Sequence, residues 1–379
     1  MKIIRTSTVA ISLDILLKGQ LEFLNNHFEV IAVSGQDKHL ENVKKREKVK
    51  TIAIEMQRNI SPLKDLKSLF QLYKLFKEEK PQIVHSITPK AGLLSMLAAK
   101  FAGVPVRIHM FTGLIFPTKT GFMQKLLIKM DKLLCWAATD IIPEGNGVKQ
   151  DLIGYNITKK PLNILANGNV NGIDIDYYNS THYNTEQKQS LKKELNIQEN
   201  DFLFVFVGRL VSDKGINELV QAFKELKSKE TNAKLLLVGS LETALDPLNP
   251  ETLQEIETND AIISVGYQND VRPYFSISDA LVFPSYREGF PNVVLQAGAM
   301  GLPSIVSDIN GCNEIIKEKE NGLIIPPKNT DALKQAMQQI EQDETLRTKL
   351  QSNAREMIVD RFEQTVLWEA LLEEYQRLL

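Results

Sequence analysis

The chain has 379 residues, of which 43% are hydrophobic and 24% charged, so its composition fits a soluble globular protein and its length predicts two domains. Its two cysteines, Cys135 and Cys312, give no metal-ligand spacing and no disulfide framework, which favours a reducing, cytoplasmic compartment. The N-terminus has no signal-peptide pattern, and no apolar run approaches the roughly 20 residues needed to span a bilayer.

The formal net charge of −2 conceals an asymmetry between the two halves of the chain. Residues 1–178 contain 25 Lys/Arg and 16 Asp/Glu, a formal +9, whereas residues 179–379 contain 20 and 31, a formal −11. A basic half indicates a face that meets an anionic surface. The alternative is that the two halves attract each other, and the sequence leaves both open.

In the first half, short apolar β-rich stretches alternate with amphipathic segments such as 62–77 and 92–101. Strands that alternate with helices predict a parallel sheet with helices on both faces. The predicted strands are KIIRTS (2–7), FEVIAVS (28–34), KTIAIE (50–55), QIVHSI (82–87), VRIHMF (106–111), DIIPE (140–144) and NILANG (163–168).

A basic amphipathic helix is predicted at 120–136, TGFMQKLLIKMDKLLCW, where apolar residues recur at helical spacing around Lys125, Lys129 and Lys132. Such helices lie on anionic membranes, so the pattern predicts a peripheral contact with the inner membrane face. The basic run 44–50, KKREKVK, supports this interpretation. The alternative is a helix packed on the sheet with solvated lysines.

The polar segment 174–200 is the predicted linker, after which the alternation restarts with helical stretches at 215–227 and 292–300. We therefore expect an α/β protein with two doubly wound domains, at 1–178 and 179–358, and a C-terminal helix at 359–379 that packs back on the first domain. Ligands should bind beyond the carboxyl ends of the strands, in a cleft between the domains. The second set of predicted strands is DFLFVFVGR (201–209), AKLLLVGS (233–240), AIISVGY (261–267), ALVFPS (280–285), PSIVSD (303–308) and NGLIIPP (321–327).

The motif FVGRLVSDKG (206–215) predicts an anion site at a strand end. Gly208 lets the backbone approach a ligand, Arg209 offers a fork to phosphate oxygens, and Lys214 adds a point charge where a helix begins. The alternative is a pair of solvated surface cations.

The motif FPSYREGFPNVVLQ (283–296) places a carboxylate and free backbone donors in a second loop. Glu288 would accept hydrogen bonds from sugar hydroxyls, and Gly289 and Phe290 would offer N–H groups to an anion. Gln296, two helical turns further on, would reach a ribose hydroxyl. Taken alone, Glu288 is better explained as a surface cap.

Together these motifs, with the following AGAMGLPSIVSDINGCNEII, resemble the nucleotide-sugar domain of the retaining family 4 glycosyltransferases, which have the GT-B fold of two Rossmann-like domains. The resemblance covers nearly the whole chain. The stretches VHSITPKAGLLSMLAA, HMFTG and NGNVNGID are similar to bacterial members that build capsular or lipid-linked oligosaccharides.

The resemblance implies a retaining transfer of a sugar from a nucleotide diphosphate donor, a UDP-sugar, to a glycan acceptor that is lipid-linked. It implies no metal or other cofactor, because Arg209 and Lys214 would stabilise the diphosphate charge. The catalytic residues would be Arg209, Lys214, Glu288 and His109, which matches the family's cleft histidine. The donor-binding set would be Gly208, Arg209, Lys214, Gly266, Tyr267, Glu288, Gly289, Phe290 and Gln296.

For the acceptor, His85 ends a strand just before Lys90, which would bind a phosphate, and Arg58 is a further candidate. The chain departs from the family at Gln296, where members usually have a second glutamate, and in having no glycine between its first strand and Gly19. Two other functions stay open: a GT-B sugar epimerase, and a non-catalytic module that binds sugar nucleotides or glycans. An NAD dehydrogenase is disfavoured because no G-x-G-x-x-G follows the first strand.

Overall fold

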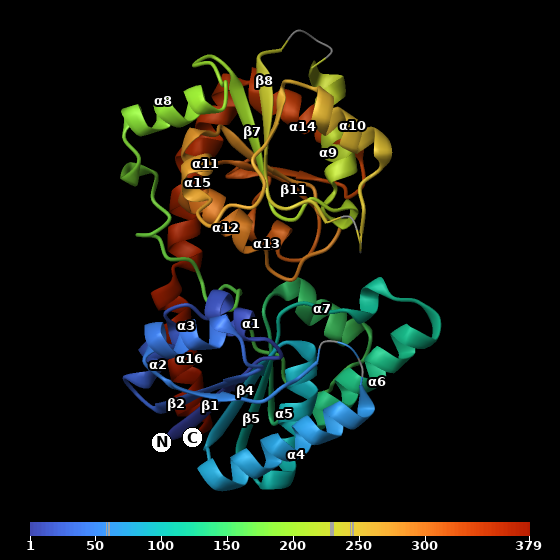
Figure 1. Ribbon diagram of the computed structural model, residues 1–379, viewed down its shortest axis with the longest axis vertical. Helices are drawn as coiled ribbons and strands as arrows, with labels where there is room; N and C mark the ends of the chain where they lie inside the picture. The colour runs from blue at the N-terminus through green and yellow to red at the C-terminus, as the bar shows by residue number, and fades with distance from the viewer. Residues whose placement is uncertain (58, 60, 228–230, 243, 245) are drawn as a thin grey trace. The chain divides into compact units, whose positions relative to one another are not determined.

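The computed structural model describes residues 1–57, 59, 61–227, 231–242, 244 and 246–379 (Figure 1). The chain divides into two compact units. Unit 1 consists of Met1–Gly172 and Gln364–Leu379, and unit 2 of Ile173–Glu363. The first division thus lies shortly before the predicted boundary at residue 178. Unit 1 has 26 Lys/Arg against 17 Asp/Glu, so it carries the positive charge noted for the first half.

Unit 1 is built on a six-stranded parallel sheet with the order β3-β2-β1-β4-β5-β6. Successive strand residues face opposite layers: Ile4 packs with α4, α5 and α6, and Ile3 packs with α1, α2 and α3. The strands are β1 (Lys2–Thr6), β2 (Glu29–Ser34), β3 (Lys50–Ala53), β4 (Ile83–Ile87), β5 (Val106–Phe111) and β6 (Asp140–Pro143). The helices are α1 (Ala10–Leu16), α2 (Gln20–Asn25), α3 (Lys38–Glu47), α4 (Pro62–Glu79), α5 (Pro89–Ala102), α6 (Gly121–Ala137) and α7 (Asn146–Gly154).

The last helix of the chain, α16 (Gln364–Leu378), completes the core of unit 1 beside α1, α2 and α3. The Trp368 indole donates a 2.8 Å hydrogen bond to Asn171, and Tyr375 is fully buried. The predicted helix at 359–379 is thus divided at Glu363, because its first residues end α15 (Glu344–Phe362) of unit 2.

Unit 2 repeats the architecture, with the order β12-β11-β10-β7-β8-β9. Helices α9, α10 and α14 cover one side of this sheet, and α11, α12 and α15 the other (Figure 1). The strands are β7 (Phe202–Val207), β8 (Ala233–Val238), β9 (Ile262–Ser264), β10 (Ala280–Phe283), β11 (Ser304–Ser307) and β12 (Gly322–Ile325). The helices are α8 (Thr185–Glu194), α9 (Ile216–Lys227), α10 (Pro250–Thr258), α11 (Arg272–Ile277), α12 (Asn292–Ala299), α13 (Cys312–Ile315), α14 (Thr330–Gln342) and α15 (Glu344–Phe362).

The two doubly wound sheets are confirmed, with two local corrections. The strand predicted at 163–168 is wrong, because only the isolated bridge between Leu162 and Ile141 forms there before the chain turns at Gly168. The polar segment 174–200 is not a plain linker, since it contains α8. Asn184 and Gln187 cap that helix reciprocally, which favours helix in a polar sequence.

Both sheets reverse their strand order between two central strands, β1 and β4 in unit 1 and β7 and β10 in unit 2. Ligands of doubly wound sheets bind beyond the carboxyl ends of the strands at this point. The predicted motifs at 206–215 and 283–296 follow β7 and β10, so they meet at the reversal point of unit 2. Among the described residues, no helix is long and apolar enough to cross a membrane.

Candidate active site

The carboxyl ends of β7 and β8 approach each other at two glycines. Gly208 and Gly239 have φ values of +152° and +155°, and a Cβ on Gly239 would lie 1.7 Å from the Gly208 carbonyl oxygen. Only glycine fits there. The Gly208 N–H donates to the Val238 carbonyl at 2.9 Å, and the Gly239 N–H donates to that of Gly266 at 2.8 Å. The backbone just before Arg209 is therefore held in place by its contacts with the end of β8.

The Arg209 side chain is 51% exposed, and its Nη1 lies 2.8 Å from a carboxylate oxygen of Glu242. An ion pair this exposed stabilises the fold little, so its guanidinium can exchange Glu242 for another anion. Tyr267, which follows Gly266, is 72% exposed.

Lys214 ends a 3₁₀ turn at 212–214 and is followed by Gly215. Gly215 has a φ of +72°, and a Cβ there would lie 2.2 Å from the Pro284 carbonyl oxygen. This close approach places the 3₁₀ turn in direct contact with the loop that follows β10. Lys214 Nζ consequently bonds to a carboxylate oxygen of Glu288 and lies 5.7 Å from the Phe283 ring centroid.

Glu288 receives a second hydrogen bond inside its own loop. Ser285, which is fully buried, donates its hydroxyl to the same oxygen, Oε1, at 2.8 Å. The Lys214 and Glu288 side chains are only 17% and 16% exposed. The two predicted motifs thus meet in one partly buried, charge-paired cluster.

Three further contacts hold the β10–α12 loop in place, and sequence reasoning missed all of them. Arg287 donates to the Asp213 carboxylate at 2.8 Å, and the Tyr286 hydroxyl lies 2.6 Å from both carboxylate oxygens of Glu218. A Cβ on Gly311, whose φ is +74°, would lie 2.5 Å from the carbonyl oxygen of Gly289. The Asn-Gly pair ending in Gly311 is a turn signal that could have drawn attention to this third loop.

The remaining donor-site candidates lie along the same loop and helix. Gly289 and Phe290 precede α12, and neither N–H makes a hydrogen bond to a residue that the structure describes. The Phe290 ring is buried against Phe362 at a centroid distance of 5.5 Å. Gln296 lies within α12 and is half-buried.

His109 lies on β5 of unit 1 and is almost fully buried. Its Nδ1 is 2.8 Å from the Ser86 hydroxyl, and a Cβ on Gly92 would lie 2.4 Å from its ring. Burial lowers the pKa of His109 to about 3, so the ring is neutral at physiological pH. Its catalytic role stays a prediction, and a neutral imidazole would act there through hydrogen bonds.

The three acceptor candidates have different surroundings. His85 is fully buried, with Nδ1 2.6 Å from the Tyr375 hydroxyl, and burial together with the nearby Arg5 holds its pKa well below the usual range. Lys90 Nζ bonds to Asp65 at 2.5 Å and to the Asn59 carbonyl at 3.0 Å. Arg58 lies outside the described residues.

The chain contains an Asp-x-Asp at 174–176, a spacing that can bind a metal. In unit 2 the Asp174 carboxylate instead accepts the backbone N–H of Tyr177 at 2.9 Å, as in a capped turn. The described residues bring no three His, Cys, Asp or Glu side chains together in a way that could hold a metal ion.

Comparison with known proteins identifies the family. The model described as "Glycosyl transferase 4-like" matches residues 12–144, and "Glycosyl transferases group 1" matches residues 187–357. The chain is 34% identical to the capsular polysaccharide biosynthesis glycosyltransferase CapM of Staphylococcus aureus, over 100% of this chain and 97% of CapM. This protein belongs to the family 4 glycosyltransferases.

Other relatives agree with this assignment. This glycosyltransferase is 30% identical to the UDP-Gal:α-D-GlcNAc-diphosphoundecaprenol α-1,3-galactosyltransferase of Escherichia coli, over 80% of this chain and 78% of that protein. The solved structure of HepE from Anabaena in complex with UDP superposes with a TM-score of 0.84 over 100% of both chains, at 17% identity. The predicted GT-B fold and glycosyltransferase class are confirmed.

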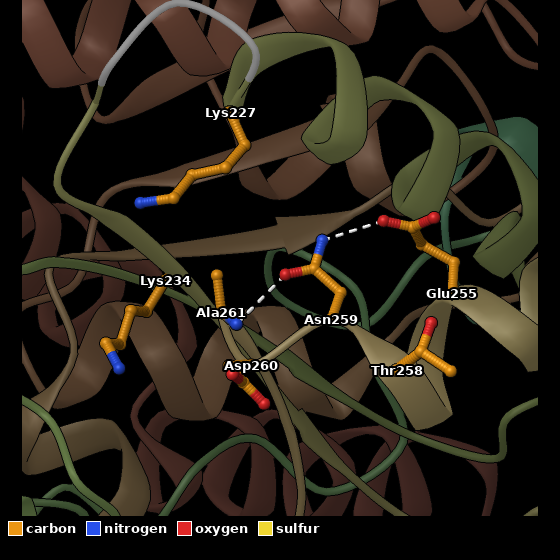
Figure 2. Close-up of a pocket in the computed structure, with 7 residues that line it drawn as sticks. All are labelled: Lys227, Lys234, Glu255, Thr258, Asn259, Asp260 and Ala261. Atoms are coloured by element: carbon orange, nitrogen blue, oxygen red, sulfur yellow. Dashed lines mark hydrogen bonds between the residues drawn. The ribbon is translucent and has the colours of Figure 1, made fainter.

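A separate hollow of about 560 Å³ lies in unit 2 beside β8 and β9 (Figure 2). It adjoins the amino ends of these strands, at Lys234 and Ala261, whereas the glycosyltransferase site follows the carboxyl ends. Within it, the Asn259 amide donates to the Glu255 carboxylate and accepts the Ala261 N–H (Figure 2). It is therefore not the candidate active site.

Proposed function

We propose that this glycosyltransferase moves a sugar, with retention of anomeric configuration, from a UDP-sugar to a glycan acceptor linked to a lipid diphosphate, in the synthesis of a capsule or another surface polysaccharide. The main support for the proposal is the ion pair between Lys214 and Glu288, which lies where the strand order of unit 2 reverses. The Lys214 ammonium suits a phosphate, and the Glu288 carboxylate suits a sugar hydroxyl. The names of the S. aureus and E. coli relatives support the pathway class, the UDP carrier and the lipid diphosphate.

Within this proposal, Arg209 and Lys214 bind the donor diphosphate and stabilise the charge that develops as it departs. The bond between the anomeric carbon and the phosphate oxygen breaks, and its electron pair leaves with UDP. The acceptor oxygen bonds to the anomeric carbon, and its proton passes to a phosphate oxygen. Two cations suffice for this charge, so the transfer needs no metal.

The other donor contacts follow from position. Glu288 accepts hydrogen bonds from sugar hydroxyls, the N–H groups of Gly289 and Phe290 bind the sugar or a phosphate oxygen, and Gln296 bonds to the ribose. The exposed Tyr267 ring, next to Gly266, is available to the base.

The acceptor would bind unit 1. The Lys90 ammonium is already paired with Asp65. To bind a phosphate of the acceptor, Lys90 would have to release that carboxylate. His85 and Arg58 are the further acceptor candidates, and His109 would reach the substrate through its ring Nε2, since Nδ1 faces Ser86.

Unit 1 would also contact an anionic membrane. On α6, Lys125, Lys129 and Lys132 are exposed and have no carboxylate partner within the described residues. They share the outward face with Phe122 and Trp136, which are 79% and 55% exposed. An exposed helix face that mixes lysines with large apolar side chains fits a lipid interface.

Helices α4 and α6 both pack against α5, and the exposed apolar residues of α4 extend the surface formed by α6. Its Leu63, Leu66 and Phe70 are 85%, 62% and 65% exposed. By contrast, the basic run at 44–50 contributes little, because Arg46, Lys48 and Lys50 are ion-paired within unit 1.

The test is turnover of UDP-sugars in the presence of a GlcNAc-diphosphate-lipid acceptor. Release of UDP with formation of an extended acceptor, in the same anomeric configuration as the donor, supports the proposal. Conversion of the donor to its epimer without acceptor would favour the epimerase, and donor binding without any turnover would favour the binding module.

A further inference from the structure

The two carboxylate oxygens of Glu288 have different surroundings. Lys214 Nζ and the Ser285 hydroxyl both bond to Oε1. No hydrogen bond or ion pair to Oε2 is found within the part of the chain that the structure describes. One oxygen is therefore held by the protein, and the other is left for a ligand. The carboxylate of a glutamate rotates easily about its last side-chain bond. Hydrogen bonds to one oxygen alone therefore fix the orientation of the Glu288 carboxylate.

Ser285 is suited to this task because it is fully buried at the end of β10. Its oxygen also lies 3.2 Å from the Arg287 carbonyl oxygen and 3.4 Å from that of Asp213. A hydroxyl has one proton to donate, and a charged acceptor at 2.8 Å is the strongest of the three. The proton of Ser285 is thus directed to Glu288.

Tyr286 fixes the segment between Ser285 and Glu288. Its hydroxyl lies 2.6 Å from both carboxylate oxygens of Glu218, in the first turn of α9, and its N–H donates to the Asp213 carbonyl at 2.9 Å. The chain entering α9 therefore holds the loop at Tyr286, through Glu218 and the Asp213 carbonyl, and at Glu288, through Lys214.

We infer that Ser285 and Tyr286 are positioning residues for sugar transfer. Ser285 orients Glu288 so that one carboxylate oxygen is available to a hydroxyl of the donor sugar, and Tyr286 keeps the loop in register through Glu218. The inference rests on the proposed role of Glu288 in binding that sugar. Neither residue touches the reacting atoms.

The experiment compares S285A and Y286F with wild type in turnover number, donor KM and the affinity for UDP alone. Each variant loses about tenfold in turnover, the order expected for one hydrogen bond to a charged group. The affinity for UDP, which has no sugar, stays within about twofold of wild type. E218Q, which keeps an acceptor oxygen for Tyr286, retains more activity than E218A. The matched controls S276A and Y274F, on α11 of the same unit, behave as wild type.

The outcomes separate this inference from the proposed function. If E288Q is impaired but S285A and Y286F turn over normally, the positioning role is wrong and the sugar-binding role of Glu288 stands. If E288Q itself is fully active, the proposed role of Glu288 in binding the donor sugar is wrong, and the positioning inference falls with it, while the transfer activity stands. If S285A and Y286F weaken UDP binding as much as they lower turnover, the two residues merely support the fold of the site, and the inference is overturned.

Discussion

The ammonium of Lys214 bonds to the carboxylate of Glu288, although the proposed reaction gives these groups different ligands, a diphosphate and a sugar. Each side chain is about one-sixth exposed, so leaving either charge unpaired would be unfavourable. The pair neutralises both charges. In the proposed reaction, donor binding would exchange this contact for contacts to the diphosphate and the sugar.

The first prediction concerns the relative weight of Glu288 and Gln296. A carboxylate that accepts sugar hydroxyls makes charge-assisted bonds, whereas the amide of Gln296 makes a neutral bond worth about 1 kcal/mol. E288Q should therefore lower turnover far more than Q296A, which should mainly raise the donor KM. Q296E should be tolerated. Steady-state kinetics of the three variants with one active donor measure these effects. A larger turnover loss in Q296A than in E288Q would show that Gln296, not Glu288, matters more for the transfer.

The second prediction concerns Arg209. R209A should cut turnover by roughly 10²-fold or more, because it removes one preorganised donor to the departing diphosphate. Its partner provides the matched control: E242Q removes the ion pair but leaves the guanidinium, so it should retain activity. Near-normal turnover in R209A would exclude Arg209 from the site.

The third prediction concerns membrane attachment. Replacing Lys125, Lys129 and Lys132 with glutamate should abolish sedimentation with anionic liposomes, because the outward face of α6 then repels the lipid. A wild-type protein that stays in the supernatant at low salt would contradict the proposal.

A matched charge reversal tests whether the effect is local. Lys317, Lys319 and Lys349 are exposed on unit 2, and their replacement with glutamate changes the net charge equally. This control should still sediment with anionic liposomes. If it is released as well, net charge rather than the α6 surface governs binding.

The fourth prediction concerns pH. His109 is neutral in the folded protein because its pKa is about 3, while the unfolded chain takes up a proton near pH 6.5. The contribution of His109 to the unfolding free energy of unit 1 is fully present above pH 6.5 and is lost as the pH falls toward 3. Between about pH 7.5 and 5, His109 should account for roughly 2 kcal/mol of lost unfolding free energy.

The measurement is urea unfolding of wild type and H109Q at the two pH values. Both tryptophans of the chain, Trp136 and Trp368, lie in unit 1, so their fluorescence reports that unit alone. H109Q should lose less stability on acidification than wild type, and H27Q, at an exposed position, should match wild type. Equal losses in wild type and H109Q would show that the ring is not held neutral.

The sheets could be predicted because strand and helix periodicities are local properties of the chain. The one predicted strand that does not form, at 163–168, has three apolar residues in a row but ends in Asn167-Gly168, and its residues turn away after Leu162. The break at Glu363 between α15 and α16 was also missed, since both sides of it have helical periodicity.

The site could be predicted only as two separate motifs. Lys214 and Glu288 are 74 residues apart, and what joins them is the lack of a side chain at Gly215, which allows its contact with Pro284. Similarly, the pairing of Lys90 with Asp65, 25 residues away, depends on how α4 packs against α5. Such partners are set by tertiary packing and leave no mark in local spacing.

The assignment of α16 to unit 1 has a consequence for synthesis of the chain. Every residue of unit 2 has been made once Glu363 is added, but unit 1 still lacks Leu367, Leu371 and Tyr375 of its own core. The domain that begins first on the ribosome is therefore the one that is finished last. Until α16 emerges, unit 1 exposes the apolar surface that this helix later covers, and a chain truncated before Gln364 would leave that surface open.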